Sequence, residues 1–284
     1  MRWGAGRKLD LSDFRPATFL DWAGISYAKH VPNVRRVRLV HVSELCISPG
    51  QRPSPNHRIY ATVGAMLDIR AVIFDLDGVL ADSEGIHILA WEEIAREYRL
   101  PEDRLPLHDW IGYPDTEIVK DVVREHRLSV TPEHLLEHKR RIFRRLIAEK
   151  LKAVPGSVEA LSELKPLPLG LATSSSRSEA ELMLRILGIE RRFRAVVTSD
   201  EVKHSKPEPD SYLLAAERLG VLPRYCVAIE DSSSGVQSAL QAGMTVLAVT
   251  NSLPAERLTA AHQIFSSTAE AVGWIKKRVN LTAL

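Results

Sequence analysis

Cysteine is scarce in this chain, which has two cysteines, Cys46 and Cys226, among 284 residues. Two cysteines are too few for a disulfide framework or a thiolate metal site, and neither has a CxxC partner. Cys226 lies in an apolar stretch and is most simply a small buried hydrophobic residue. The sequence therefore predicts a protein of a reducing compartment, and we expect it in the cytoplasm.

Long hydrophobic runs are also missing. The longest apolar stretches, such as Val246–Val249, have the length of a strand, so no membrane-spanning segment is predicted. The net charge of +2 gives no electrostatic reason to expect binding to nucleic acid or to a membrane. No strand-like run is followed by GxGxxG, which argues against dinucleotide binding. We expect a monomer that binds or converts a small molecule.

Residues 1–65 differ from the rest of the chain. They hold ten arginines and lysines against four acidic residues, and Ser48–His57 is rich in proline, serine and glycine. This segment shows no sustained helical or strand period. We predict a basic, poorly ordered extension. Met66 stands just before the first clear strand and would make a natural initiator.

From Ile69 onward, apolar strand-like runs alternate with helical periods. This alternation predicts an α/β fold, a Rossmann-like doubly wound parallel sheet covered by helices on both faces, formed by 66–83 and 153–284. About 85 residues separate the first two strands, too many for an ordinary crossover. Their amphipathic helical pattern predicts an inserted α-helical cap domain over 84–152. The expected strands are Ala71–Asp77, Leu169–Ser174, Ala195–Asp200, Cys226–Asp231 and Thr245–Thr250.

The first strand ends in Phe-Asp-Leu-Asp-Gly, with acidic residues at Asp75 and Asp77. Side chains alternate along a strand, so these two carboxylates should point the same way. Two carboxylates at the end of a buried strand are costly unless they bind a cation or do chemistry. The same residues also fit a strand followed by an ordinary Asp-Gly turn.

A second acidic pair, Glu230 and Asp231, ends a later strand. Ligands of open parallel sheets bind outside the carboxyl ends of the strands. Four carboxylates that converge there would suit Mg²⁺, which prefers oxygen ligands. The alternative is that Asp231 or Ser232 caps the following helix.

Two further strand ends carry groups that could hold a phosphate. Thr173, Ser174 and Ser175 come just before a predicted helix, where hydroxyls and free amides make an anion site. Lys206 follows the third strand and precedes Pro207, which suits the start of the next helix. A serine-rich loop or a lysine can also simply be solvated.

Taken in order, Phe-Asp-Leu-Asp-Gly-Val-Leu, Ala-Thr-Ser-Ser, Ser-Lys-Pro-Glu-Pro-Asp and Ile-Glu-Asp-Ser resemble the four motifs of the haloacid dehalogenase superfamily. The chain is most similar to the β-phosphoglucomutase-like phosphatases that carry a helical cap. The resemblance implies that Asp75 is the nucleophile and that Asp77 is the general acid and base. It also implies that Thr173 and Lys206 hold the phosphoryl oxygens.

The same resemblance implies a Mg²⁺ cofactor. Asp75, Asp231 and the backbone carbonyl of Asp77 would bind the ion, with Glu230 in support. Dehalogenases and phosphonatases of this superfamily lack an acid two residues after the nucleophile. Asp77 therefore favours phosphate-ester chemistry, in which the leaving oxygen needs a proton.

The cap is expected to set the substrate. His87 and Trp91 lie one helical turn apart and match a His and a Trp of β-phosphoglucomutase. Lys139 lies on an apolar helical face, so its side chain should either snorkel or point into a cleft, and it also matches a cap lysine of that family. After the second motif we expect substrate contacts from Ser174, Ser175 and Arg177.

The chain departs from the mutase at two positions, where Asp115 and Ser176 replace residues that hold a second phosphate. A carboxylate repels a phosphate, so these changes weaken the mutase interpretation, although the adjacent Arg177 could partly compensate.

We therefore expect a Mg²⁺-dependent phosphatase that hydrolyses a small phosphorylated metabolite, a sugar phosphate, through an aspartyl-phosphate. One alternative is a β-phosphoglucomutase-type mutase. Another is a catalytically silent ligand-binding protein on the same fold, against which the four intact motifs argue.

Overall fold

The protein is described by a computed structural model that covers residues 68–101, 105–107, 110 and 113–279. The predicted basic extension, 1–65, lies outside these residues. Within the part described, no helix is long and apolar enough to cross a membrane.

Six parallel strands of the described chain form one sheet in the order β3-β2-β1-β4-β5-β6. The chain runs outward from β1 to β3 and then returns to β4 on the other side of β1. The switch point between β1 and β4 is where such folds bind ligands. This topology confirms the predicted doubly wound α/β fold. The strands are β1 Ala71–Phe74, β2 Leu169–Ala172, β3 Ala195–Val197, β4 Cys226–Glu230, β5 Thr245–Val249 and β6 Gln263–Phe265.

The strands are shorter than the apolar runs that predicted them. Pairing of β1 with β4 ends at Phe74, after which the Asp75 amide donates to the Ile229 carbonyl at 3.0 Å. The chain then turns at Gly78, whose φ of 68° suits glycine. The edge strand β6 was not predicted, because it has three residues, too few to show a strand period.

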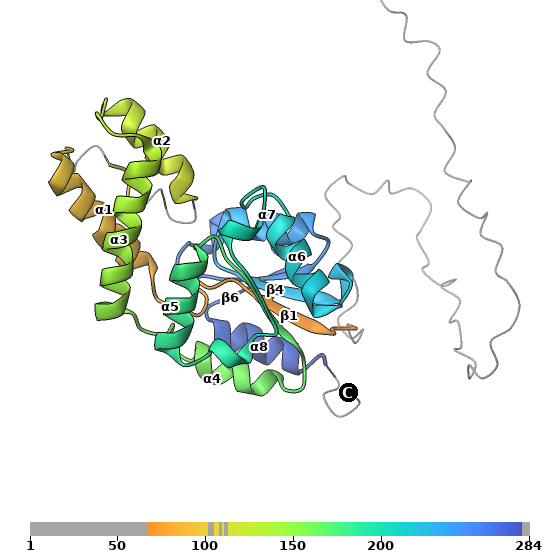
Figure 1. Cartoon of the computed structure of the whole chain (residues 1–284). Coiled ribbons are helices and arrows are strands. Elements are labelled where there is room, and N and C mark those ends of the chain that lie inside the picture. Colours follow the sequence, from red (N-terminus) through yellow and green to blue (C-terminus); the bar gives the residue numbers. More distant parts are fainter. Residues whose placement is uncertain (1–67, 102–104, 108–109, 111–112, 280–284) are drawn as a thin grey trace, which may run out of the picture. The chain divides into compact units, whose positions relative to one another are not determined.

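Helices cover both faces of the sheet. On one face Ile73 and Ala228 pack against α6 and α7, while on the other Val72 and Phe74 pack against α5 and α8. Figure 1 shows α6 and α7 on one side of the sheet and α4 and α8 on the other. The covering helices are α4 Ser157–Leu161, α5 Arg177–Leu187, α6 Asp210–Leu219, α7 Ser233–Gln241 and α8 Thr268–Lys276. Short 3-10 turns span Ser162–Leu164, Glu190–Arg192, Ser199–Glu201, Pro223–Tyr225 and Ala255–Arg257.

Between β1 and β2, the described residues form three α-helices: α1 Glu84–Tyr98, α2 Asp115–Glu125 and α3 Pro132–Lys150. Thr131 caps α3 by accepting a hydrogen bond from the His134 amide at 3.2 Å. The apolar faces of α1 and α2 both pack on α3, and α3 also contacts α5 of the core. The three helices occupy the segment predicted as the cap.

Candidate active site

Asp75 stands directly after β1, at the carboxyl edge of the sheet. Its buried carboxylate accepts a hydrogen bond through Oδ1 from Lys206 Nζ at 2.6 Å. Lys206 also donates to the Ala172 carbonyl at 3.0 Å and to Glu230 Oε1 at 2.6 Å. Burial would lower the pKa of Lys206, but the charges of Asp75 and Glu230 raise this pKa above its ordinary value. Lys206 is therefore a fixed positive charge beside Asp75.

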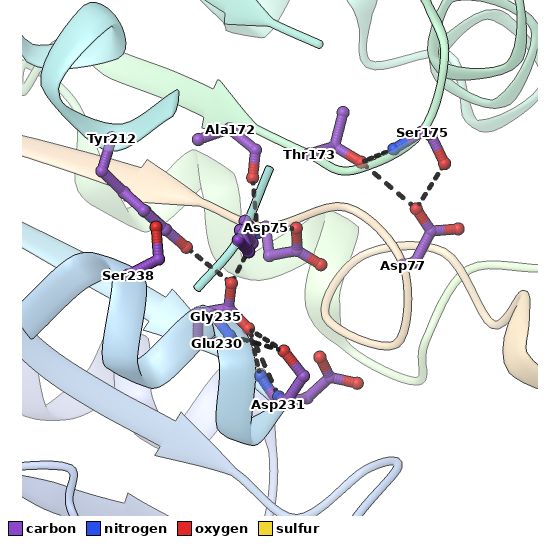
Figure 2. A network of polar contacts seen from close by, with 12 residues as sticks. Asp75, Asp77, Ala172, Thr173, Ser175, Tyr212, Glu230, Asp231, Gly235 and Ser238 are labelled. Carbon is purple, nitrogen blue, oxygen red and sulfur yellow. Dashed lines mark hydrogen bonds and ion pairs between the residues drawn. The ribbon is translucent and has the colours of Figure 1, made fainter. Parts of the chain in front are cut away.

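Glu230 ends β4 and is completely buried. Its Oε1 accepts from the Tyr212 hydroxyl at 2.8 Å, and its Oε2 accepts from the Asp231 amide at 3.1 Å and the Ser232 hydroxyl at 3.0 Å. A Cβ on Gly235 would fall 1.8 Å from Oε1, so only glycine fits there. Figure 2 shows Glu230 pointing toward Asp231 and Gly235. Its acceptor sites are filled by the protein, so Glu230 serves to position its neighbours.

Asp75, Glu230 and Asp231 each place a carboxylate oxygen within 4.8 Å of the others. Burial raises the pKa values of Asp75 and Asp231 well above their ordinary range, and the charge of Glu230 raises them further. A Cβ on Gly78 would lie 1.8 Å from Asp231 Oδ2, so the turn closes tightly over this carboxylate. Crowded buried carboxylates of this kind suit a hard cation such as Mg²⁺. The residues present fit the implied metal.

The sequence predicted that four carboxylates converge, but Asp77 does not belong to this cluster of three. Its Oδ1 accepts from Ser83 at 2.6 Å, and its Oδ2 accepts from Ser175 at 2.7 Å and Thr173 at 3.3 Å. Figure 2 shows Asp77 turned toward Thr173 and Ser175. The strand ends at Phe74, so strand alternation no longer governs where Asp77 points.

The pKa of Asp77 is set by opposing effects. Burial would raise the pKa, but His87, whose Nε2 lies 3.7 Å from Oδ1, and the two serine hydroxyls lower it to about 2. Asp77 is therefore ionised in the structure as it stands.

The end of β2 supplies the predicted hydroxyls. Thr173 is buried and accepts from the Ser175 amide at 3.0 Å, while Ser174 is exposed at the cavity wall. Ser176 forms a capping box with Glu179 at the start of α5, in which the Ser176 amide donates to the Glu179 carboxylate at 2.9 Å. The Ser176 hydroxyl also donates to this carboxylate, at 2.5 Å. The hydroxyl of Ser176 is thus used within the fold.

Arg177 is not brought to the cavity. Its amide donates to Asp200 at 2.6 Å, and its guanidinium donates to the Val196 carbonyl at 3.2 Å and pairs with Glu201. Residues lining the cavity do not include it. The structure therefore gives no support to the expectation that Arg177 contacts the substrate.

One cavity joins these core residues to the cap. On the core side its wall includes Asp75, Asp77 and Asp231, and on the cap side it includes His87 and Trp91. The wall carries further residues that the sequence did not single out for a role in the site: Glu84, Leu107, Trp110, Tyr113 and Arg140.

Four cap side chains form a hydrogen-bonded group beside the cavity. Lys139 is fully buried and lies 2.5 Å from Asp115 Oδ2 and 2.6 Å from His87 Nδ1, while Trp91 donates to Asp115 Oδ1 at 3.3 Å. Burial would raise the pKa of Asp115, but the charges of Lys139 and His87 lower it below its ordinary value. Lys139 therefore neither snorkels nor faces the cavity, the two possibilities the sequence suggested.

Sequence reasoning missed several residues that support the site. Tyr212 bonds Glu230 from α6, and Ser252 donates to Asp231 from the loop after β5. Nothing in the local sequence marks either one. Ser83 could have been found, because it stands just before α1 and six residues after Asp77.

Comparison with known proteins agrees with this geometry. Residues 72–249, more than half of the chain, match the haloacid dehalogenase-like hydrolase family. The fructose-1-phosphate phosphatase of Escherichia coli K12 is 34% identical over 63% of this chain and 95% of its own length. The phosphorylated carbohydrates phosphatase of Thermotoga maritima is 39% identical over 62% of this chain and 82% of its own length.

Among solved structures, a putative β-phosphoglucomutase from Thermotoga maritima matches with a TM-score of 0.60 and 34% identity, covering 74% of this chain and all of that one. The named phosphatases confirm the predicted enzyme class, a phosphoric monoester hydrolase. The family match, the sheet topology and the four strand-end motifs agree, and the chain belongs to the haloacid dehalogenase-like hydrolases.

Proposed function

We propose that the protein is a Mg²⁺-dependent phosphatase that hydrolyses a sugar phosphate through an aspartyl-phosphate on Asp75. The observation that carries this proposal is the arrangement around Asp75. Its carboxylate lines the cavity and is held through Oδ1 by Lys206. Its Oδ2 forms no hydrogen bond with the described residues, so this oxygen is free to attack phosphorus.

The reaction has two displacements. In the first, a carboxylate oxygen of Asp75 bonds to phosphorus, the bond from phosphorus to the sugar oxygen breaks, and Asp77 gives its proton to that oxygen. In the second, water attacks the phosphoryl group, Asp77 takes a proton from the water, and Asp75 leaves as a free carboxylate. Thr173 and Lys206 orient the phosphoryl oxygens in both steps.

Mg²⁺ would be held by Asp75 and Asp231, with the backbone carbonyl of Asp77 as a further ligand. When bound, the ion supplies positive charge that lets an anionic nucleophile approach an anionic phosphate. Glu230 supports this site by holding Lys206 and the Asp231 amide in place.

The low pKa of Asp77 belongs to the ligand-free site. A phosphate dianion beside Asp77 would raise this pKa, because a nearby like charge disfavours the ionised carboxylate. Ser175 and Thr173, which now donate to Asp77, can also turn toward phosphate oxygens. Substrate binding would therefore prepare Asp77 to carry the proton that the leaving sugar needs.

A sugar phosphate is favoured because relatives of this chain are named as phosphatases of fructose 1-phosphate and of phosphorylated carbohydrates. The mutase alternative rests on the structural likeness to a putative β-phosphoglucomutase. Two observations oppose it. Asp115, which by the resemblance stands where the mutase holds a second phosphate, is a carboxylate already paired with Lys139. The Ser176 hydroxyl is already bonded to Glu179.

The test is a phosphate-release screen over a panel of sugar phosphates, with and without Mg²⁺, for the wild type and Asp75→Asn. We expect release only with Mg²⁺ and a loss of about 10³-fold or more in the variant. Wild-type turnover by Asp75→Asn would refute Asp75 as nucleophile. With glucose 1-phosphate and a trace of the 1,6-bisphosphate, glucose 6-phosphate forming faster than free phosphate would establish the mutase instead.

A further inference from the structure

Two adjacent cations of α3, Lys139 and Arg140, occupy different environments. Lys139 is fully buried, and its ammonium is neutralised by Asp115 at 2.5 Å and also bonded to His87. The ammonium lies 4.5 Å from the centre of the Phe143 ring. Lys139 does not line the cavity, so it acts within the cap and has no open donor directed at a ligand.

Arg140 is the opposite case. Its side chain lines the cavity and is partly buried, and it forms no ion pair, hydrogen bond or ring contact with the described residues. Two other arginines of α3 are paired, Arg144 with Glu137 and Arg145 with Glu93. Arg141 also has no partner among the described residues, but it is exposed and does not line the cavity. A guanidinium has five N–H donors, so Arg140 presents unused donors to the space beside it.

The surroundings of Arg140 indicate what those donors meet. Trp110 and Tyr113 line the same cavity, and Trp110 packs against Trp91 with ring centres 5.1 Å apart. An aromatic wall covers the C–H face of a sugar, while a planar guanidinium donates to a pair of neighbouring oxygens. Asp115 does not compete for Arg140, because its carboxylate is already held by Lys139 and Trp91.

From this contrast we infer that Arg140 is a specificity-determining residue, which contacts the oxygen atoms of the sugar portion of the substrate. The inference rests on the proposed phosphatase function. Lys139, the cap lysine that the sequence suggested for this role, instead positions Asp115 and His87.

The experiment compares Arg140→Gln with Arg141→Gln. Arg141 is the next residue of α3, is exposed and does not line the cavity, so its variant is a matched control. Each is assayed on phenyl phosphate, which has no oxygen beyond its phosphate, and on the sugar phosphate that the wild type hydrolyses fastest. Arg140→Lys, which keeps the charge and loses the planar fork, is assayed alongside, and thermal unfolding verifies that each variant is folded.

We expect Arg140→Gln to lower kcat/KM for the sugar phosphate about tenfold or more, mainly by raising KM. Its kcat/KM for phenyl phosphate should stay within about twofold of the wild-type value. For the sugar phosphate, the kcat/KM of Arg140→Lys should lie between the values of the wild type and Arg140→Gln. Arg141→Gln should match the wild type on both substrates. Equal losses on both substrates, or no loss on either, would overturn the inference and leave the phosphatase intact. A wild type that hydrolyses phenyl phosphate but no sugar phosphate would also overturn it. A wild type inactive on every ester would refute the proposed function as well.

Discussion

The two ends of the cavity are built in different ways. At the core end, Asp75 follows β1, Lys206 follows β3 and Glu230 is the last residue of β4. Backbone groups complete the hydrogen bonds of these residues, such as the Ala172 carbonyl and the Asp231 amide. At the cap end, contacts run between side chains of separate helices, as between Lys139 and Asp115. Arg140 has no partner there in the described chain.

For the proposed phosphatase, this difference separates the end that would carry out the reaction from the end that would select the substrate. Groups tied to backbone atoms cannot move without disturbing the sheet, which suits the proposed nucleophile and metal site. Side-chain contacts between helices can change while the helices remain packed. Substitutions at the cap end could therefore change which ligand is accepted there without altering the core end. The following variants disturb each end in turn.

The largest effect on stability is expected at the core end, from Lys206→Met. Lys206 lies 2.6 Å from both Asp75 and Glu230, and all three are buried. Removing the ammonium leaves two uncompensated buried carboxylates, which should lower the free energy of unfolding by about 3–5 kcal/mol. Urea denaturation measures this loss, and phosphate release should also fall sharply. If the variant were as stable as the wild type, the ion pairs of Lys206 with Asp75 and Glu230 would not be what stabilises the core end.

Mg²⁺ binding should stabilise the same end in a pH-dependent way. The pKa values of Asp75 and Asp231 are raised in the folded state, so the folded protein holds these protons more tightly than the unfolded chain. In metal-free protein, their contribution to stability therefore decreases as pH rises above about 4, where the unfolded carboxyls ionise. Mg²⁺ should offset this loss, by about 2.7 kcal/mol at 100 times its Kd.

Thermal unfolding at pH 5 and pH 7, with and without Mg²⁺, tests this expectation. The rise in Tm should be larger at pH 7, because the ligands must be ionised to bind. Asp231→Asn serves as the control and should lose most of the response. An equal Mg²⁺ effect at both pH values and in the control would place the ion elsewhere.

At the cap end, Asp115→Asn should have a smaller effect. The variant keeps an acceptor for Trp91 but removes the charge that faces buried Lys139, which should cost roughly 1–3 kcal/mol. Asp121→Asn, on the exposed side of α2 and paired with Arg124, is the matched control and should cost less than about 1 kcal/mol. Phenyl phosphate turnover should persist in both variants. If Asp115→Asn abolished it, the two ends would be coupled more tightly than their contacts indicate.

Much of the core end could be predicted because acidic and hydroxyl residues at successive strand ends must meet at one edge of a parallel sheet. Asp75 and Asp231 meet there for that reason. Tyr212 and Ser252 could not be predicted, since their approach depends on how α6 and the loop after β5 pack. At the cap end, the pattern showed Lys139 on an apolar face. Its pairing with Asp115 follows from the packing of α2 on α3, which periodicity does not encode.

The smallest effect is expected outside both ends, at Arg177. Arg177 and Arg218 both donate to the Val196 carbonyl, at 3.2 and 2.9 Å, and both pair with Glu201. In Arg177→Ala, Arg218 still pairs with Glu201, so the free energy of unfolding should fall by less than about 1 kcal/mol. Because Arg177 does not line the cavity, kcat/KM should stay within about twofold on every ester.

The pH dependence of this small loss provides a sharper test. Burial would raise the pKa of Glu201, but hydrogen bonds from Arg218 and Thr198 and the charge of Arg177 lower it to about 2. A carboxyl with a lowered folded pKa contributes stability above its unfolded pKa of 4.5, and that contribution disappears as pH falls toward 2. The difference in stability between Arg177→Ala and the wild type should therefore be present at pH 7 and vanish near pH 2. A tenfold fall in kcat/KM for the sugar phosphate, with phenyl phosphate unchanged, would instead return Arg177 to the substrate-binding group.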